Sequence, residues 1–351
     1  MQLNVILRSL VLVAGAALAG CGQTLPTQPS TPSSTATPGA GAASATPQPP
    51  VKVGIALGGG AAKGFAHIGV IKMLEANGFA PAVVSGTSAG SVVGALYASG
   101  MNAFEMQEKA VALDEAKIRD LQWSSGGLLQ GQKLEDYVNE QVRRKPLEQM
   151  AKPFVAVATR LEDGERTVFA RGNTGQAVRA SSSVPGVFQP VTIGKYHFVD
   201  GGIVSPVPVD AARQLGADIV IAVDISNKAR GQSPGDMLGT LGQSIAIMGQ
   251  KLGQAELARA DVIIRPQVLD IGSADFSQRT NAILEGEKAA LAVMPQIRER
   301  IAQLQTDRAN AARAAQQKAA EAQYQACLEK RSSLQKLAGM ARLDDSCAAP
   351  K

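Results

Sequence analysis

The sequence contains few of the residue types on which several common chemistries depend. Its 351 residues include only two histidines and three cysteines, and aromatic side chains make up 4%. So few aromatic residues argue against a surface on which nucleic-acid bases stack. The formal net charge is +5, but residues 51–295 contain 24 basic and 24 acidic residues, so the basic excess lies outside this segment. Nucleic acid is therefore not an expected partner.

The first residues have the order of charge, apolar run and small residues that is typical of a secretory signal. Arg8 lies before the run SLVLVAGAALAG, which is too short to span a bilayer comfortably. The last four residues of this segment, Leu18 to Cys21, resemble the lipobox of bacterial lipoproteins. The resemblance implies a signal peptide over 1–20 and a lipid on Cys21. The expected location is the cell envelope, at the periplasmic face of the outer membrane. A plain signal peptide with an incidental cysteine is the alternative.

The segment that follows lacks charge altogether. Residues 22–50 contain seven prolines and ten Ser/Thr residues, so they cannot form a core, and 21–50 is predicted to be a disordered linker after the lipidated cysteine. The two other cysteines, Cys327 and Cys347, lie near the C-terminus. In an exported protein such a pair often forms a disulfide, and free thiols are the alternative.

From Val51 onward, short β-branched apolar runs alternate with helical patterns. This alternation predicts a mostly parallel sheet covered by helices on both faces, within a domain over 51–295. The expected strands are 51–57, 82–84, 154–159, 166–170, 196–200, 218–225 and 261–266. After about Thr280 the pattern is helical, and the Ala- and Gln-rich residues 296–351 are predicted to form a helical C-terminal extension.

The stretch GTSAG at 86–90 joins a β-branched run to a run of residues that suits a helix. A serine hydroxyl is a poor nucleophile unless it is exposed and oriented. A strand–turn–helix elbow achieves this for Ser88, and it requires small neighbours such as Gly86 and Gly90. The start of the following helix would favour an anion beside the serine. The alternative is an ordinary glycine turn with a solvated Ser88.

A second glycine-rich stretch, GGGAAKG at 58–64, also lies between a predicted strand and a predicted helix. A dinucleotide site would need glycine where Ala61 stands and an acidic residue at the end of the second strand. A P-loop would need Ser or Thr directly after Lys63, where Gly64 stands. The backbone amides of this loop are instead expected to bind an oxyanion that forms when Ser88 attacks a carbonyl group.

The base that deprotonates Ser88 is unlike that of a Ser-His-Asp triad. His197 and Asp200 lie three residues apart on one predicted strand, so their side chains point to opposite faces. No histidine follows Asp200, although α/β-hydrolases have the order Ser, acid, His. His67 fits a packed helix residue. The two histidines and the scattered acidic residues show no metal-ligand spacing, so no metal is expected. The remaining candidate is Asp200 itself, at the end of a strand before Gly201.

Four blocks, GGGAAKG, GTSAG, ASSSVPGVFQPV (180–191) and DGG (200–202), resemble the patatin-like phospholipases, and FAHIGVIKMLEANG is similar to their bacterial branch. The resemblance covers about 51–215 and extends more weakly to 295. It implies a three-layer α/β/α fold and a lipid acyl hydrolase. Ser88 would be the nucleophile and Asp200 the base. The implied oxyanion hole consists of the backbone amides of Gly59, Gly60, Ala61 and Ala89. The other motif residues are Gly58, Lys63, Gly64, Gly86, Gly90, Gly201 and Gly202. Ala61 in place of glycine and Lys63 in place of the common arginine depart from the family pattern.

The sequence therefore predicts an enzyme that cleaves carboxylic esters of phospholipids or other acyl esters through an acyl-serine intermediate, without a cofactor. One alternative is a weak or inactive envelope lipoprotein that uses the same cleft to bind lipid or cell wall. A nucleotide-binding protein that uses residues 58–64 as a phosphate loop is another. The oligomeric state is left open by these patterns.

Overall fold

The structure, a computed structural model, describes residues 49–118, 120, 129–226, 237–338 and 347. These residues all belong to one unit of the chain, Gln48–Lys351. The predicted signal peptide, Cys21 and nearly all of the predicted linker lie outside the described residues.

An eight-stranded sheet with the order β5-β6-β3-β2-β1-β7-β8 forms the centre of the fold, and β4 pairs with β3 outside this path. Its strands are β1 (Val53–Leu57), β2 (Val83–Thr87), β3 (Phe154–Arg160), β4 (Arg166–Phe169), β5 (Val191–Ile193), β6 (Tyr196–Asp200), β7 (Ile219–Val223) and β8 (Val262–Ile264). The neighbouring strands β3, β2, β1, β7 and β8 are parallel to one another. The strands β4 and β6 run antiparallel to β3. The predicted strands are confirmed, and the three-residue β5, which pairs with β6, is an addition.

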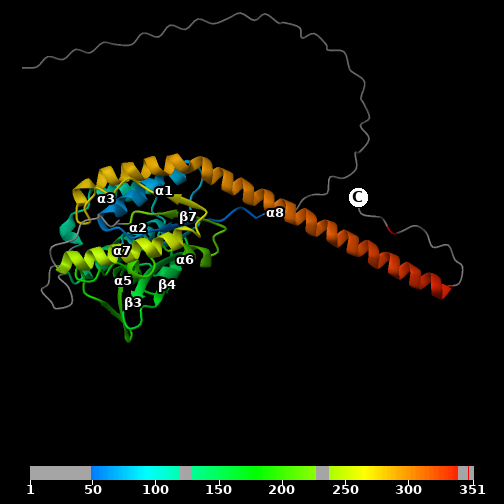
Figure 1. The fold of residues 1–351 in the computed structure, drawn as a ribbon, viewed down its shortest axis with the longest axis horizontal. Helices are drawn as coiled ribbons and strands as arrows, with labels where there is room; N and C mark the ends of the chain where they lie inside the picture. The colour runs from blue at the N-terminus through cyan, green and yellow to red at the C-terminus, as the bar shows by residue number, and fades with distance from the viewer. Residues whose placement is uncertain (1–48, 119, 121–128, 227–236, 339–346, 348–351) are drawn as a thin grey trace, which may run out of the picture. The chain divides into compact units, whose positions relative to one another are not determined.

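Helices cover both faces of the sheet, as Figure 1 shows. One face carries α1 (Ala66–Ala76), α2 (Ala89–Ala98), α3 (Ala103–Val111), α4 (Gln132–Gln141), α5 (Thr174–Ser181) and α8 (Arg279–Ala338), and the other carries α6 (Val209–Gln214) and α7 (Met237–Leu257). The β1 side chains alternate accordingly: Ile55 packs on the α1 side, whereas Ala56 packs with Val209 and Leu257. The predicted three-layer fold is confirmed.

A single long helix, α8, forms the C-terminal part of the described chain and runs along α1 (Figure 1). Ile297 is fully buried in the main core, so core packing continues without a break in the helix across the predicted boundary between 295 and 296. Farther along, Cys327 of α8 is joined to Cys347 by a disulfide. None of the helices in the described ranges is long and apolar enough to cross a membrane.

Candidate active site

Ser88 occupies a sharp turn between β2 and α2. Its backbone has φ 54° and ψ −124°, a left-handed φ that non-glycine residues rarely adopt, and its side chain is largely buried. A Cβ on Gly90 would lie 2.1 Å from the carbonyl oxygen of Leu57, and one on Gly86 would lie 2.4 Å from that of Gly90. The two glycines therefore allow α2 to begin directly against β1, and this close approach holds Ser88 in its strained conformation.

The sheet register brings Asp200 to this turn. On β3, Val157 pairs with Thr87 of β2, and the next residue, Ala158, pairs with Asp200 of β6. The ends of β2 and β6 therefore meet along β3. A Cβ on Gly201 would lie 3.1 Å from Cγ2 of Thr87, which shows how closely the two ends approach. Ser88 follows Thr87, and Asp200 precedes Gly201. These two residues are thus adjacent in space.

The carboxyl group of Asp200 is buried, with 7% of the residue exposed, and its two oxygens have different surroundings. Oδ1 accepts a hydrogen bond from the amide of Gly202 (2.6 Å). Oδ2 has no hydrogen-bond partner of ordinary geometry in the described part of the chain, and it is available to a proton. Burial raises the pKa of Asp200 to about 6, against the opposing effects of the Ser88 hydroxyl and the Gly202 amide. A carboxylate with a pKa near 6 is a stronger base than an exposed one.

The C-terminal end of α5 and the residues just after it form hydrogen bonds with both Ser88 and Asp200. The hydroxyl of Ser181 accepts a hydrogen bond from the amide of Ser88 (2.9 Å) and donates one to the carbonyl oxygen of Val157 (2.6 Å). The carbonyl oxygen of Ser183 accepts a hydrogen bond from the amide of Asp200 (2.9 Å). Ser181 was not predicted as a site residue, although it lies in the block ASSSVPGVFQPV. Its role depends on a contact between segments 93 residues apart.

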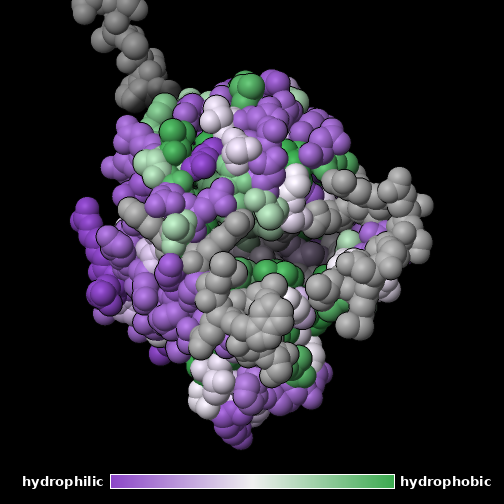
Figure 2. Space-filling model, turned by 90° about the vertical axis from the view of Figure 1, so that its left-hand side faces the viewer, coloured by the Kyte–Doolittle hydropathy of each residue, from purple (hydrophilic) through white to green (hydrophobic). Residues whose placement is uncertain are grey.

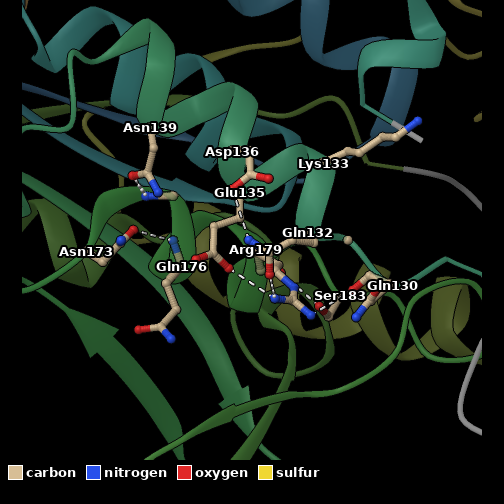
Figure 3. Close-up of polar contacts among 12 residues, drawn as sticks. Gln130, Gln132, Lys133, Glu135, Asp136, Asn139, Asn173, Gln176, Arg179 and Ser183 are labelled. Carbon is tan, nitrogen blue, oxygen red and sulfur yellow. Dashed lines mark hydrogen bonds and ion pairs between the residues drawn. The ribbon is translucent and has the colours of Figure 1, made fainter. Parts of the chain in front are cut away.

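Arg179 fixes the orientation of this helix end, as Figure 3 shows. Its guanidinium group donates hydrogen bonds to Gln132 (2.9 Å) and to the carbonyl oxygen of Gln130 (2.8 Å), and it forms an ion pair with Glu135 (3.1 Å). The Ser183 hydroxyl closes the arrangement by donating to the carbonyl oxygen of Arg179 (2.8 Å). The helices α4 and α5 are therefore connected by polar contacts directly beside the two catalytic candidates.

The glycine loop lies against the turn at Ser88. A Cβ on Gly59 would lie 3.3 Å from Cβ of Ser88, and one on Gly64 would lie 2.7 Å from Cβ of Ala89. The amide of Gly59, a predicted oxyanion donor, donates to the carbonyl oxygen of Pro206 (3.0 Å) in this conformation. Gly59 instead fixes the loop, as does Gly58, whose amide donates to Val223.

The other three predicted donors remain candidates. The amides of Gly60, Ala61 and Ala89 have no backbone acceptor among the described residues. Ala61 has φ 52°, a value at which alanine is strained and glycine is not. Glycine is also the residue that the family resemblance leads one to expect at this position. Lys63 and Gly64 lie in the short 3-10 helix η1 (Ala61–Phe65), and the Lys63 side chain is buried.

Neither histidine serves Ser88. His67 is fully buried in α1, and its Nε2 forms a hydrogen bond with the carbonyl oxygen of Gly58 (2.8 Å). Burial lowers the pKa of His67 to about 4, so this ring is neutral near pH 7 and Nε2 is the donor. His197 is exposed and contacts Glu162. Within the described ranges, no three His, Cys, Asp or Glu residues lie together as a metal site would require.

Comparison with known proteins relates part of this chain to one family. Residues 55–213 match the sequence profile described as patatin-like phospholipase. An uncharacterized NTE family protein of Mycobacterium tuberculosis is 36% identical over 182 residues, which are 51% of this chain and 51% of that protein. A protein named lysophospholipase NTE1, of Pyricularia oryzae, is 26% identical over 279 residues, which cover 70% of this chain and 19% of that protein. The chain thus spans about half the length of its mycobacterial relative.

Among solved structures, VipD from Legionella pneumophila superposes with a TM-score of 0.41 at 15% sequence identity, over 70% of this chain and 67% of that one. The sequence match, by contrast, covers the segment that contains the glycine loop, Ser88 and Asp200. Residues 55–213 of this chain are therefore similar in sequence to the patatin-like phospholipases.

Proposed function

We propose that the protein hydrolyses acyl esters of lipids through a dyad of Ser88 and Asp200. The observation that carries the proposal is the meeting of β2 and β6 along β3, which puts a strained serine beside a buried carboxyl group with a free oxygen. Such a pair can activate a hydroxyl group directly, without an intervening imidazole.

In the proposed reaction, Oγ of Ser88 attacks the ester carbonyl carbon while Oδ2 of Asp200 accepts the hydroxyl proton. The resulting oxyanion is stabilised by the amides of the glycine loop, with Gly60, Ala61 and Ala89 as donors, and by the N-terminus of α2. The tetrahedral intermediate collapses, the alcohol leaves with the proton from Asp200, and acyl-Ser88 remains. Water, deprotonated by Asp200, then attacks the acyl carbonyl carbon. The fatty acid is released when the bond to Ser88 breaks and Oγ takes the proton back from Asp200.

The family description and the name of the fungal relative support a phospholipid or lysophospholipid as the substrate. The surface of α7 supports a substrate in a lipid aggregate. Leu241, Met248 and Leu252 lie on one side of this helix at helical spacing, and they are 43%, 48% and 40% exposed. Gly249 of the same helix lies close to Gly202, since a Cβ built on it would be 3.7 Å from the Gly202 carbonyl oxygen. An apolar surface next to a catalytic loop suits contact with acyl chains.

Figure 2 shows one face of the molecule on which some apolar residues lie at a central hollow among polar ones, and contact with a membrane would bring lipid to such a face. We also propose that a lipid on Cys21 anchors the protein to the cell envelope, at the outer membrane and facing the periplasm. This proposal rests on the sequence pattern at Leu18 to Cys21 alone.

Replacement of the nucleophile tests the function. Ser88→Ala should reduce turnover of a p-nitrophenyl acyl ester, and release of fatty acid from phospholipid vesicles, by at least about a thousandfold, with thermal unfolding little changed. Ser99→Ala, at the other end of α2, is the matched control, because the Ser99 hydroxyl only caps the carbonyl oxygen of Leu96. Undiminished turnover in Ser88→Ala would refute the proposal. Absence of turnover, and of Ser88 labelling by a fluorophosphonate, in the unmodified protein would favour the alternative of a lipid-binding lipoprotein.

A further inference from the structure

A buried carboxyl group lies outside the dyad, at the end of α7. Glu256 is 5% exposed, and both of its oxygens accept hydrogen bonds from one short segment of chain. Oε1 accepts from the hydroxyl of Ser205 (2.5 Å), and Oε2 accepts from the amide of Val207 (2.8 Å). These contacts hold the residues on either side of Pro206.

The segment that Glu256 holds contacts each part of the active site. The carbonyl oxygen of Pro206 accepts from the amide of Gly59 (3.0 Å) in the glycine loop. The carbonyl oxygen of Ser205 accepts from the hydroxyl of Thr87 (2.8 Å), the residue before the nucleophile. The amide of Ser205 donates to the carbonyl oxygen of Gly201 (2.8 Å), the residue after Asp200. The loop, the nucleophile and the base are therefore all connected through residues 205–207.

The position of Glu256 is electrostatically unfavourable, which argues that it does more than fill space. A carboxylate is disfavoured by burial and by the C-terminal end of a helix, and Glu256 lies in the last turn of α7. The basic groups around it are already engaged: Arg259, two residues after the end of α7, and Arg166 of β4 both form ion pairs with Asp210 of α6. Glu256 itself forms none with the described residues.

We propose that Glu256 is a positioning residue for the hydrolysis described above: by holding Ser205 and Val207, it sets the backbone that orients the glycine loop and the turn at Ser88. The expected effect of Glu256 on catalysis rests on the proposed function. The structural connection from α7 to the glycine loop and to Thr87 is independent of that function.

Protonation should weaken this arrangement. An ionised Glu256 accepts both hydrogen bonds, whereas a proton on Oε1 would compete with the hydroxyl proton of Ser205 in a buried space. Burial, with a smaller contribution from Asp210, raises the pKa of Glu256 to about 7, against the Ser205 and Val207 hydrogen bonds and Arg166. Activity should therefore rise through the ionisation of Asp200 near 6, and rise further through that of Glu256 near 7 by no more than the about threefold loss expected for the neutral variant Glu256→Gln.

Two substitutions separate the hydrogen bonds from the charge. Glu256→Ala removes both hydrogen bonds, and its kcat for a soluble ester should fall by about 10- to 100-fold with KM within about twofold of the wild-type value. In Glu256→Gln the amide nitrogen can donate to Ser205 and the oxygen can accept from Val207. Its kcat should stay within about threefold of the wild-type value, and the pH profile should lose the ionisation near 7 and keep that near 6. Gln254→Ala, exposed on the same helix, is the control.

Hydrogen exchange measured by mass spectrometry tests the structural part independently of activity. Glu256→Ala should increase exchange in peptides covering 55–65 and 84–91, which do not contact Glu256, whereas Gln254→Ala should not. The inference is overturned by wild-type kcat in folded Glu256→Ala, by a Gln variant as impaired as the Ala variant, or by increased exchange confined to residues 203–208. If the wild-type protein hydrolyses no ester, the proposed function fails, and the exchange experiment alone decides the inference.

Discussion

Replacement of Asp200, the proposed catalytic base, should make the protein more stable while it abolishes the proposed hydrolysis. In Asp200→Asn, the side-chain oxygen can still accept from the Gly202 amide. The new amide nitrogen takes the place of Oδ2, which has no partner of ordinary geometry among the described residues, and it can donate to the Ser88 hydroxyl. The variant thus keeps the existing hydrogen bond and removes a buried charge.

The expected size of this effect follows from the pKa of the carboxyl group, which is raised from 3.8 to about 6 in the folded protein. A raised carboxyl pKa means that the folded state binds the proton more tightly than the unfolded state does. The stability of the wild-type protein therefore falls as pH rises through the window from about 4 to about 6, and the loss is complete above it. Two pH units correspond to about 3 kcal/mol, which is the largest gain expected for Asp200→Asn at pH 8.

Thermal unfolding of the two proteins at pH 4.5 and at pH 8 measures this gain. The variant should unfold roughly 5–10 °C higher at pH 8, and the difference should shrink toward pH 4.5. Asp210→Asn is the control with the opposite sign, because its ion pair with Arg259 lowers the pKa of Asp210, and loss of that ion pair should destabilise the protein more at pH 8 than at low pH. Lower stability of Asp200→Asn at pH 8, or a difference that does not vary with pH, would refute the assignment of a buried, proton-accepting carboxylate.

Two further outcomes follow from the backbone of the glycine loop and from the surface of α7. Ala61→Gly should relieve the strain of the positive φ at this residue and raise the free energy of unfolding, measured with denaturant, by about 0.5–1 kcal/mol. A lower free energy of unfolding in this variant would contradict the strain inferred at Ala61. The double substitution Leu241→Ser and Met248→Ser should reduce hydrolysis of vesicle phospholipid about tenfold more than hydrolysis of a soluble ester, whereas equal losses on both substrates would exclude a contact of α7 with lipid aggregates.

The strands of the sheet could be predicted from the sequence because most are buried, β-branched runs with clear ends. The exception is β5, whose β-branched run Val191–Ile193 is only three residues long and which forms through pairing with β6. The domain boundary placed at 295 also followed a change in composition. Packing does not follow that change, because α8 is continuous and Ile297 is still within the core.

The residues of the active site were predictable as chemical types but not as contacts. Ser88 and Asp200 could be chosen because each lies beside glycine at the end of a predicted strand, and because the four motif blocks resemble one family. Their proximity depends on β3 pairing with both β2 and β6, which no local pattern encodes. For the same reason the sequence did not show that the Gly59 amide is occupied by Pro206, or that Ser181 supports the nucleophile from a distant helix.

A dyad without histidine requires that the carboxylate be basic and that nothing nearby cancel this basicity. The groups that shift the pKa of Asp200 are burial, the Ser88 hydroxyl and the Gly202 amide, and no cation is among them. A lysine or arginine beside Asp200 would stabilise the anion, lower its pKa and weaken it as a base. The same logic explains the surroundings of Glu256, where Asp210 engages both neighbouring arginines. The pKa values of the two buried carboxyl groups thus lie at about 6 and about 7, because no cation among the described residues shifts that of Asp200 and because Asp210 pairs with both arginines near Glu256.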